Sequence, residues 1–161
     1  AIKTVEILRI AGIDAHLYVV GTNVDIKSPY IHVYGKLDKD NPEEFCVLDR
    51  LFRESDWLLF PSKHEGSAIT PREAAAYGLP TLAYRIEGML NSVIDGQSGV
   101  LLESGNGPGD FAEVILDWLK NPDAFQHLCL GAREFYESDA KWVGKVQKLI
   151  PILESLLQSG N

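Results

Sequence analysis

The stretch from Trp57 to Pro80 constrains the fold more than any other part of the sequence. Four apolar residues, Trp57 to Phe60, form a short continuous run that is typical of a buried parallel strand. A polar loop follows, and the alanine-rich segment after Thr70 predicts a helix that ends at Gly78-Leu79-Pro80. Because open α/β sheets bind ligands at the carboxyl ends of their strands, this stretch predicts both a fold class and a site.

The rest of the chain repeats the same pattern of short apolar runs separated by helical segments. Such alternation predicts an α/β fold, with a parallel sheet covered by helices on both faces through right-handed crossovers. The expected strands are Ala15–Val20, Tyr30–Tyr34, Trp57–Phe60, Thr81–Tyr84 and Val100–Leu102. The other expected helices are Ala1–Ala11, Glu43–Glu54, Met89–Ile94, Phe111–Lys120, Asp123–Glu137 and a last one, capped by Ser138-Asp139, through roughly Leu157.

Two features predict that residues 1–161 form one domain of a longer protein, truncated at its N-terminal end. The chain starts on a helix, and three helices follow the last strand where a minimal domain of this class needs one. The last of them, about residues 139–157, must bury its apolar stripe on the sheet or on something absent. That stripe contains Trp142, Val143, Val146, Leu149 and Ile150.

Charge and composition narrow the classes of partner. The formal net charge is −8, and no basic stripe offsets it, so a nucleic acid is not an expected partner. Cys46 and Cys129 lie far apart in apolar helical patterns and predict two reduced thiols in a cytoplasmic protein. No apolar run approaches the ~18 residues that span a bilayer. The sequence leaves open whether the protein associates with the cytoplasmic face of a membrane.

The segment Thr70-Pro71-Arg72-Glu73 has two interpretations. In the structural one, Thr70 is the N-cap, Pro71 the first helical residue, and Glu73 completes a capping box. In the functional one, Glu73 accepts hydrogen bonds from two hydroxyls of a ribose, because a carboxylate has two oxygens that suit a vicinal diol. Spacing alone does not decide between them.

Glu65 lies at the apex of the preceding loop, followed by the small residues Gly66, Ser67 and Ala68. Glycine lets a ligand approach the backbone, and amides near a helix start can face an anion. A solvated loop glutamate is the alternative. His64, next to Glu65, is a candidate contact or a surface histidine.

These residues resemble the signature of the retaining nucleotide-sugar glycosyltransferases of family 4, the glycosyl transferase group 1 domain. The signature reads Pro-Ser-x-x-Glu-Gly-x-Gly, then four residues, then Glu-Ala-x-Ala-x-Gly-x-Pro. This chain has Pro61–Ala68 and Glu73–Pro80 in those places, and Asp95–Gly99 continues the match. The resemblance covers roughly residues 1–137.

The resemblance implies one half of a GT-B enzyme, which has two facing Rossmann-like domains. This half would bind a UDP-, GDP- or ADP-sugar, and its partner would be an N-terminal acceptor domain that the last helix contacts. It implies that Glu73 binds the ribose and that Glu65, the catalytic candidate, positions the donor sugar and leaving group. The other implied binding residues are the amides of Gly66, Ser67, Ala68 and Ile69 for diphosphate and sugar, Gly35, Lys36 and Leu37 for the base, and His64. No metal or cofactor is expected.

The expected activity is transfer of a sugar to an acceptor with retained configuration, of hexosyltransferase type. The family's phosphate-neutralising cations lie on a segment before Ala1, so this fragment alone should be inactive. A nucleotide-sugar 2-epimerase-like domain and a non-catalytic nucleotide-binding or assembly domain of the same fold are the alternatives. Compared with the family, Ala68 replaces the second glycine of Glu-Gly-x-Gly, and Glu87 and Asn91 replace the first glycine and the acid of a later Gly-Gly-x-x-Glu loop. These departures keep the non-catalytic alternative open.

Overall fold

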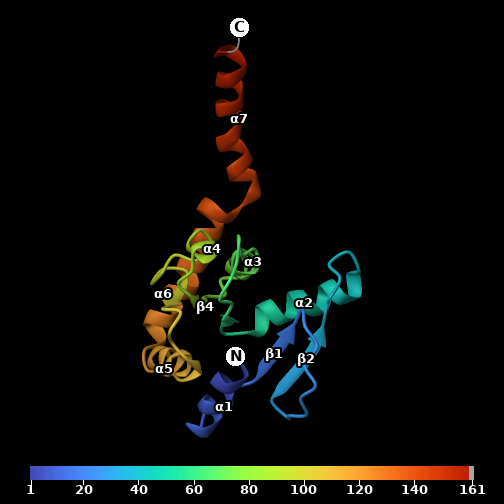
Figure 1. Cartoon of the computed structure of the whole chain (residues 1–161), viewed down its shortest axis with the longest axis vertical. Helices are drawn as coiled ribbons and strands as arrows, with labels where there is room; N and C mark the ends of the chain where they lie inside the picture. The colour runs from blue at the N-terminus through green and yellow to red at the C-terminus, as the bar shows by residue number, and fades with distance from the viewer. Residues whose placement is uncertain (160–161) are drawn as a thin grey trace.

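The structure, a computed structural model, describes residues 1–159, except for the side chains at positions 142, 143, 145, 148, 158 and 159. Strands and helices alternate, as the sequence predicts (Figure 1). The strands are β1 (Leu17–Val20), β2 (Ile31–Gly35), β3 (Leu58–Phe60), β4 (Thr81–Tyr84) and β5 (Gly99–Leu102). The helices are α1 (Ile2–Ile10), α2 (Pro42–Glu54), α3 (Thr70–Ala76), α4 (Glu87–Leu90), α5 (Pro108–Leu119), α6 (Pro122–Phe135), a π-helical turn η1 (Tyr136–Ala140) and α7 (Trp142–Ser159).

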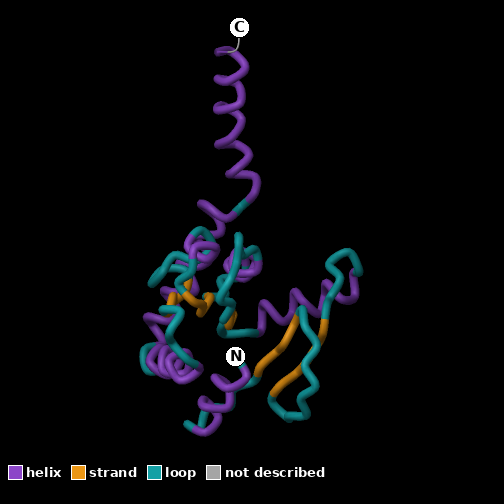
Figure 2. Tube along the Cα trace, viewed as in Figure 1, coloured by secondary structure: helices purple, strands orange, loops and turns teal. Residues whose placement is uncertain are grey.

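The strands lie in two parallel sheets rather than in one continuous sheet. β1 pairs with β2, and β3, β4 and β5 form the second sheet in that order. Figure 2 shows the two groups of strands separated from one another. Among residues 1–159, no strand pairs with the second edge of β1 or of β3, and the sheet is interrupted there.

Helices cover both faces of the second sheet, and β4 is buried along its whole length. Leu82 and Tyr84 point to one face and pack with Phe111 of α5 and with α1. Ala83 points to the other face and packs with Met89 of α4. A strand buried on both sides explains why this segment is a continuous apolar run rather than an alternating one.

Asparagine followed by proline marks two of the helix starts. The Asn41 side chain accepts from the Glu43 amide at 3.0 Å, and the Asn121 side chain accepts from the Ala124 amide at 3.2 Å. The sequence predicts both starts. Asp110, expected as an N-cap, instead lies inside α5 and accepts from the Gly107 amide at 2.6 Å, so this helix begins three residues earlier.

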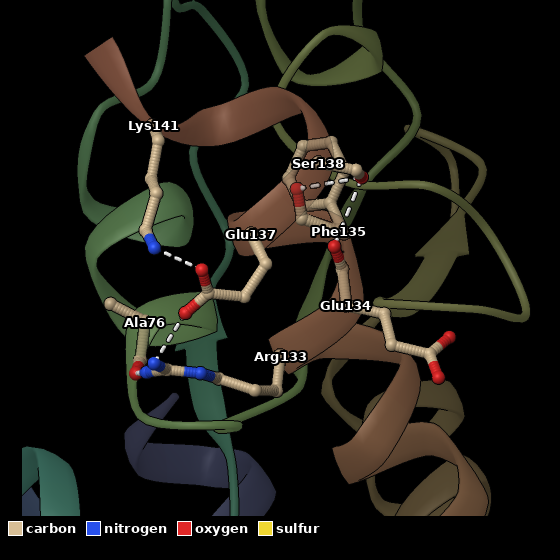
Figure 3. A network of polar contacts seen from close by, with 7 residues as sticks. All are labelled: Ala76, Arg133, Glu134, Phe135, Glu137, Ser138 and Lys141. Atoms are coloured by element: carbon tan, nitrogen blue, oxygen red, sulfur yellow. Dashed lines mark hydrogen bonds and ion pairs between the residues drawn. The ribbon is translucent and has the colours of Figure 1, made fainter. Parts of the chain in front are cut away.

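The joint between α6 and α7 differs from the prediction that Ser138-Asp139 caps the last helix. Ser138 Oγ donates back to the Glu134 carbonyl at 2.9 Å, so the chain continues from α6 into the π-helical turn (Figure 3). Lys141, with extended backbone, then ends the turn before α7 begins. Glu137 accepts from both Arg133 and Lys141 and ties the joint together.

α7 projects away from the rest of the domain (Figure 1). The described part of its apolar stripe is therefore not buried on the sheet. The exposed apolar side chains on it are Val146, Leu149, Ile150, Ile152, Leu153, Leu156 and Leu157. The side chains of Trp142 and Val143 lie outside the described residues.

Neither cysteine is in a disulfide: Cys46 is exposed and Cys129 is half-buried. Within the described part of the chain, no helix is both long enough and apolar enough to cross a membrane.

Candidate functional site

The loop between β3 and α3 lies against the segment that follows β4. Both strands are parallel, so the loops at their carboxyl ends emerge at the same edge of the sheet. The Ala68 amide donates to the Gly88 carbonyl at 3.1 Å and joins the two loops. The edge at which the sequence predicts a site is therefore built from two segments.

Gly88 makes the close approach of these segments possible. A Cβ atom at position 88 would lie 2.0 Å from the Glu65 carbonyl oxygen, a distance that no side chain tolerates. The backbone of Glu65 is thus pressed onto the first turn of α4. Gly88 matches the second glycine of the Gly-Gly-x-x-Glu loop named above, and this contact gives a physical reason for a glycine at position 88.

A second set of hydrogen bonds fixes the end of the loop. Ser92, 1% exposed, donates from Oγ to the Ala68 carbonyl at 2.6 Å. Arg72 donates from Nε to Ser92 Oγ at 3.2 Å and from a terminal nitrogen to the Asn91 carbonyl at 2.9 Å. Sequence reasoning misses both roles. The charge of Arg72 inside the motif is the only sequence signal of this network. Nothing in the sequence distinguishes Ser92 from a surface serine on a short helix.

Glu65 lines a hollow of ≈ 430 Å³ at this edge. Its own side chain is half-buried, whereas His64 and Gly66 are exposed. The other lining residues are Lys63, Ile86 and Glu87. The hollow therefore combines two carboxylates, an imidazole and an ammonium group, which could contact the hydroxyls and phosphates of a ligand.

The remaining predicted amides of the loop differ in their surroundings. Ser67 and Ile69 are exposed, and Ala68 is buried. In this structure the Ala68 amide already has the Gly88 carbonyl as its partner. The exposed residues Gly66, Ser67 and Ile69 therefore remain as the candidates in this loop for contact with a ligand.

Glu73 does not form the capping box. The helix begins at Thr70 itself, the residue before it is Ile69 in a helical conformation, and no side chain caps the helix start. The Glu73 carboxylate instead accepts from Lys39 Nζ. The structural interpretation of Thr70–Glu73 is therefore wrong, and the carboxylate faces the loop that follows β2.

That loop contains the three residues expected beside the base. Gly35 ends β2 with φ +65°, and a Cβ atom there would lie 2.7 Å from the Asn23 side chain. Lys36 is exposed and Leu37 is half-buried. Through Lys39, this loop contacts Glu73 of α3. Glu65 lies in separate surroundings, in the hollow described above.

A larger hollow of ≈ 730 Å³ lies between α3 and α6, away from the Glu65 loop. Its two arginines, Arg53 and Arg133, already pair with Asp49 and Glu137. Burial raises the pKa of the Cys129 thiol in its wall, which makes that thiol a weaker nucleophile. The smaller hollow, at the sheet edge, is therefore the better candidate site.

Within the described residues, no group of three or more His, Cys, Asp or Glu side chains is arranged to hold a metal ion.

Comparison with known proteins gives consistent results. The profile of the family described as "Glycosyl transferases group 1" matches residues 1–121. An uncharacterized glycosyltransferase of Methanocaldococcus jannaschii is 30% identical over 138 residues, which cover 84% of this chain and 37% of that protein. The chain thus spans little more than a third of this relative.

Two solved structures illustrate the fold. Sucrose-phosphate synthase from Thermosynechococcus elongatus superposes with a TM-score of 0.74 at 19% identity, covering 98% of this chain and 42% of that one. HepE from Anabaena, solved in complex with UDP, superposes with a TM-score of 0.72 at 16% identity, covering 94% and 44%. At these identities, the likeness supports the Rossmann-like half of a GT-B arrangement and not a particular substrate.

Proposed function

The chain belongs to the group 1 glycosyl transferases, and we propose that it binds the nucleotide-sugar donor for transfer of the sugar to an acceptor, with retained anomeric configuration. The observation that carries the proposal is the position of Glu73. Its carboxylate is not used by the helix start and faces the loop after β2. In α/β nucleotide-binding folds, an acidic residue at this edge of the sheet often binds the ribose hydroxyls.

The donor sugar and its leaving diphosphate would occupy the hollow beside Glu65. Small, exposed residues of the loop leave backbone amides accessible near the start of α3. Lys63, one of the lining residues, adds a cation at the rim. Catalysis would consist mainly of positioning and of stabilising the charge that develops on the diphosphate. Glu65 would position the donor sugar and its leaving group.

UDP is the nucleotide to test first. One of the similar solved structures, HepE, contains UDP. GDP and ADP remain the other candidates for the base, and the transferred sugar would be a hexose.

The proposal extends to a second domain. The exposed apolar side chains of α7 would pack on an N-terminal acceptor domain, which would leave residues 1–161 able to bind a donor but not to turn it over. The two free cysteines support a reducing compartment such as the cytoplasm, with or without contact with the inner face of a membrane.

Isothermal titration of the chain with UDP, GDP and ADP tests the proposal. Glu73→Ala should weaken binding of the preferred nucleotide by ~1.5–3 kcal/mol, because charge-assisted hydrogen bonds to the ribose are lost. Glu113→Ala, an exposed glutamate of α5, is the matched control and should bind as the parent does. If Glu73→Ala lowers only the melting temperature, Glu73 has a structural role and the proposed ribose contact is wrong.

A further inference from the structure

The larger hollow, between α3 and α6, has charged side chains of only one sign in its lining. Its walls come from the end of α2, the end of α3 and one face of α6. Among the described residues that line it, Arg53 and Arg133 are the charged ones, and none is a carboxylate. The hollow is therefore cationic, although the chain has a formal net charge of −8.

Arg53, in the last turn of α2, is held by a carboxylate that lies outside this lining. Its Nε and one terminal nitrogen donate to the two oxygens of Asp49 at 2.8 and 3.1 Å. Its guanidinium carbon lies 5.2 Å from the centroid of the Tyr77 ring, and the Tyr77 hydroxyl donates to Asp49 at 2.8 Å. A guanidinium has more N–H donors than these two bonds use, so Arg53 keeps donors for a ligand.

Arg133, in the α6 wall, is held in a similar way (Figure 3). It donates from one terminal nitrogen to the Ala76 carbonyl and from the other to Glu137. Its guanidinium carbon lies 5.5 Å from the centroid of the Tyr136 ring. Glu137 also accepts from Lys141, so this group of one carboxylate and two cations keeps a net positive charge. A planar cation that is already positioned binds an anion with little further loss of side-chain freedom.

The rest of the lining is mostly apolar. Leu130 lies one turn before Arg133 on the same face of α6, and it is 56% exposed. Gly78 ends α3 with φ +71°, and a Cβ atom there would lie 3.3 Å from the Cys129 carbonyl oxygen, so α3 and α6 are in contact at this point. Gln126 adds one amide side chain. The volume of ≈ 730 Å³ is in the range of small-molecule sites.

We propose that the larger hollow is a second binding site, for a small organic dicarboxylate whose acidic groups are joined by an apolar chain. Each carboxylate would pair with one arginine, because two parallel N–H groups of a guanidinium match the two oxygens of a carboxylate. The apolar chain would cover Leu130. The site shares no lining residue with the hollow at Glu65, so the proposal does not depend on which donor the domain binds.

Suberate, a straight-chain dicarboxylate, and octanoate, the monocarboxylate with the same number of carbon atoms, are suitable probes. NMR titration of the isotope-labelled chain should show shifts at the amides of Gly78, Gln126 and Leu130 and at the guanidinium groups of both arginines. Suberate should bind at least ~10-fold more tightly than octanoate, because it forms a second set of charge-assisted hydrogen bonds. Equal affinities, or shifts that avoid the hollow, would overturn the proposal.

A pair of arginine variants separates a specific contact from a general effect of charge. Arg53→Gln should weaken the binding of suberate ~10-fold. Arg50→Gln makes the same change in net charge on the same helix, at an exposed position outside the lining, and should bind as the parent does. Equal weakening in the two variants would mean that suberate responds only to net charge, and the site would be refuted.

A pair of leucine variants tests the site without removing an ion pair. Leu130→Glu places a carboxylate in the lining and should abolish the binding of suberate. Leu119→Glu, on α5, changes a leucine that is equally exposed, at 55%, and should have no effect. Both positions are at the surface, so both variants should melt as the parent does. Binding of suberate that survives Leu130→Glu would rule out the hollow as its site.

The same titrations keep this site distinct from the donor site. Glu73→Ala should leave the binding of suberate unchanged, because Glu73 is outside the lining. A chain that binds suberate but no nucleotide would contradict the donor proposal alone. A chain that binds a nucleotide but not suberate would contradict the dicarboxylate site alone.

Discussion

Lys39 and Glu73 form an ion pair that joins the loop after β2 to the first turn of α3. The two residues are 34 positions apart in sequence. Their side chains are 52% and 33% exposed, so water screens the pair and its contribution to stability is small. The pair matters because Lys39 contacts the Glu73 carboxylate, the group that we propose binds the ribose.

Lys39→Met should therefore strengthen the binding of a nucleoside without phosphates. A ribose must displace or share the Lys39 ammonium group, and an exposed pair of this kind is worth a change of about two- to fivefold in affinity. Titration with uridine measures the effect. Lys27→Met, an exposed lysine in another loop, makes the same change in net charge and is the control. A weaker affinity for uridine would mean that Lys39 contacts the nucleoside instead of competing with it.

Gly88→Ala should disturb the site more than any other glycine-to-alanine change near it. The new Cβ atom would meet the Glu65 carbonyl at 2.0 Å, and both partners are backbone, which cannot move easily. Overpacking of this kind costs about 1–3 kcal/mol. Calorimetric melting should show this loss for Gly88→Ala and almost none for Gly105→Ala, whose Cβ would point into open space. Equal melting temperatures would show that the Glu65 loop moves freely.

Ser92→Ala should loosen the same loop from its other end. The change leaves the buried Ala68 carbonyl without its partner, which costs about 1–3 kcal/mol. Chemical denaturation measures the loss, and Ser104→Ala, an exposed serine, is the control. Arg72→Leu removes the donor to Ser92 Oγ. The loss of unfolding free energy in the double variant with Ser92→Ala should be smaller than the sum of the two single losses. Fully additive losses would show that Arg72 and Ser92 act independently.

Glu137 gives the joint before α7 a predictable dependence on pH. The hydrogen bond from Lys141 holds the pKa of Glu137 below its usual value. A carboxyl group whose pKa is lowered on folding stabilises the folded state above the unfolded pKa, and this contribution is lost as the pH falls through the folded pKa. The difference in free energy of unfolding between the parent and Glu137→Gln should thus be present at pH 7 and disappear in acid, below the ordinary glutamate pKa of 4.5.

Urea denaturation between pH 3 and pH 7 measures this difference. Glu134→Gln, one turn away with its carboxylate pointing elsewhere (Figure 3), should show no such dependence. A difference that stays constant into acid would mean that Glu137 contributes through packing and not through its charge.

The sequence predicts the elements well where a local pattern determines them. β4 has the expected bounds because it is buried on both faces. α2 and α6 start as expected because in each an asparagine N-cap is followed by a proline as the first helical residue. The family also follows from local motifs, since the loop and the helix of the signature are contiguous.

The errors arise where a distant residue or a competing bond decides the outcome. Glu73 pairs with Lys39 rather than capping its own helix, and no pattern around Thr70 reveals this. Ser138 bonds to a carbonyl one turn back, so the expected cap becomes a π-helical turn. The contact between Gly88 and Glu65 joins segments 23 positions apart, which only the folded chain shows.

The π-helical turn before α7 also has a mechanical consequence. α7 has 18 residues and extends about 27 Å at the usual helical rise. A rotation of about 10° at Lys141 would move the far end of such a helix by about 5 Å, whereas its base would hardly move. The helix is therefore a lever arm, and the ion pairs of Glu137 are at its pivot. A small change in the angle of this joint would therefore move whatever contacts the tip much further than anything beside the base.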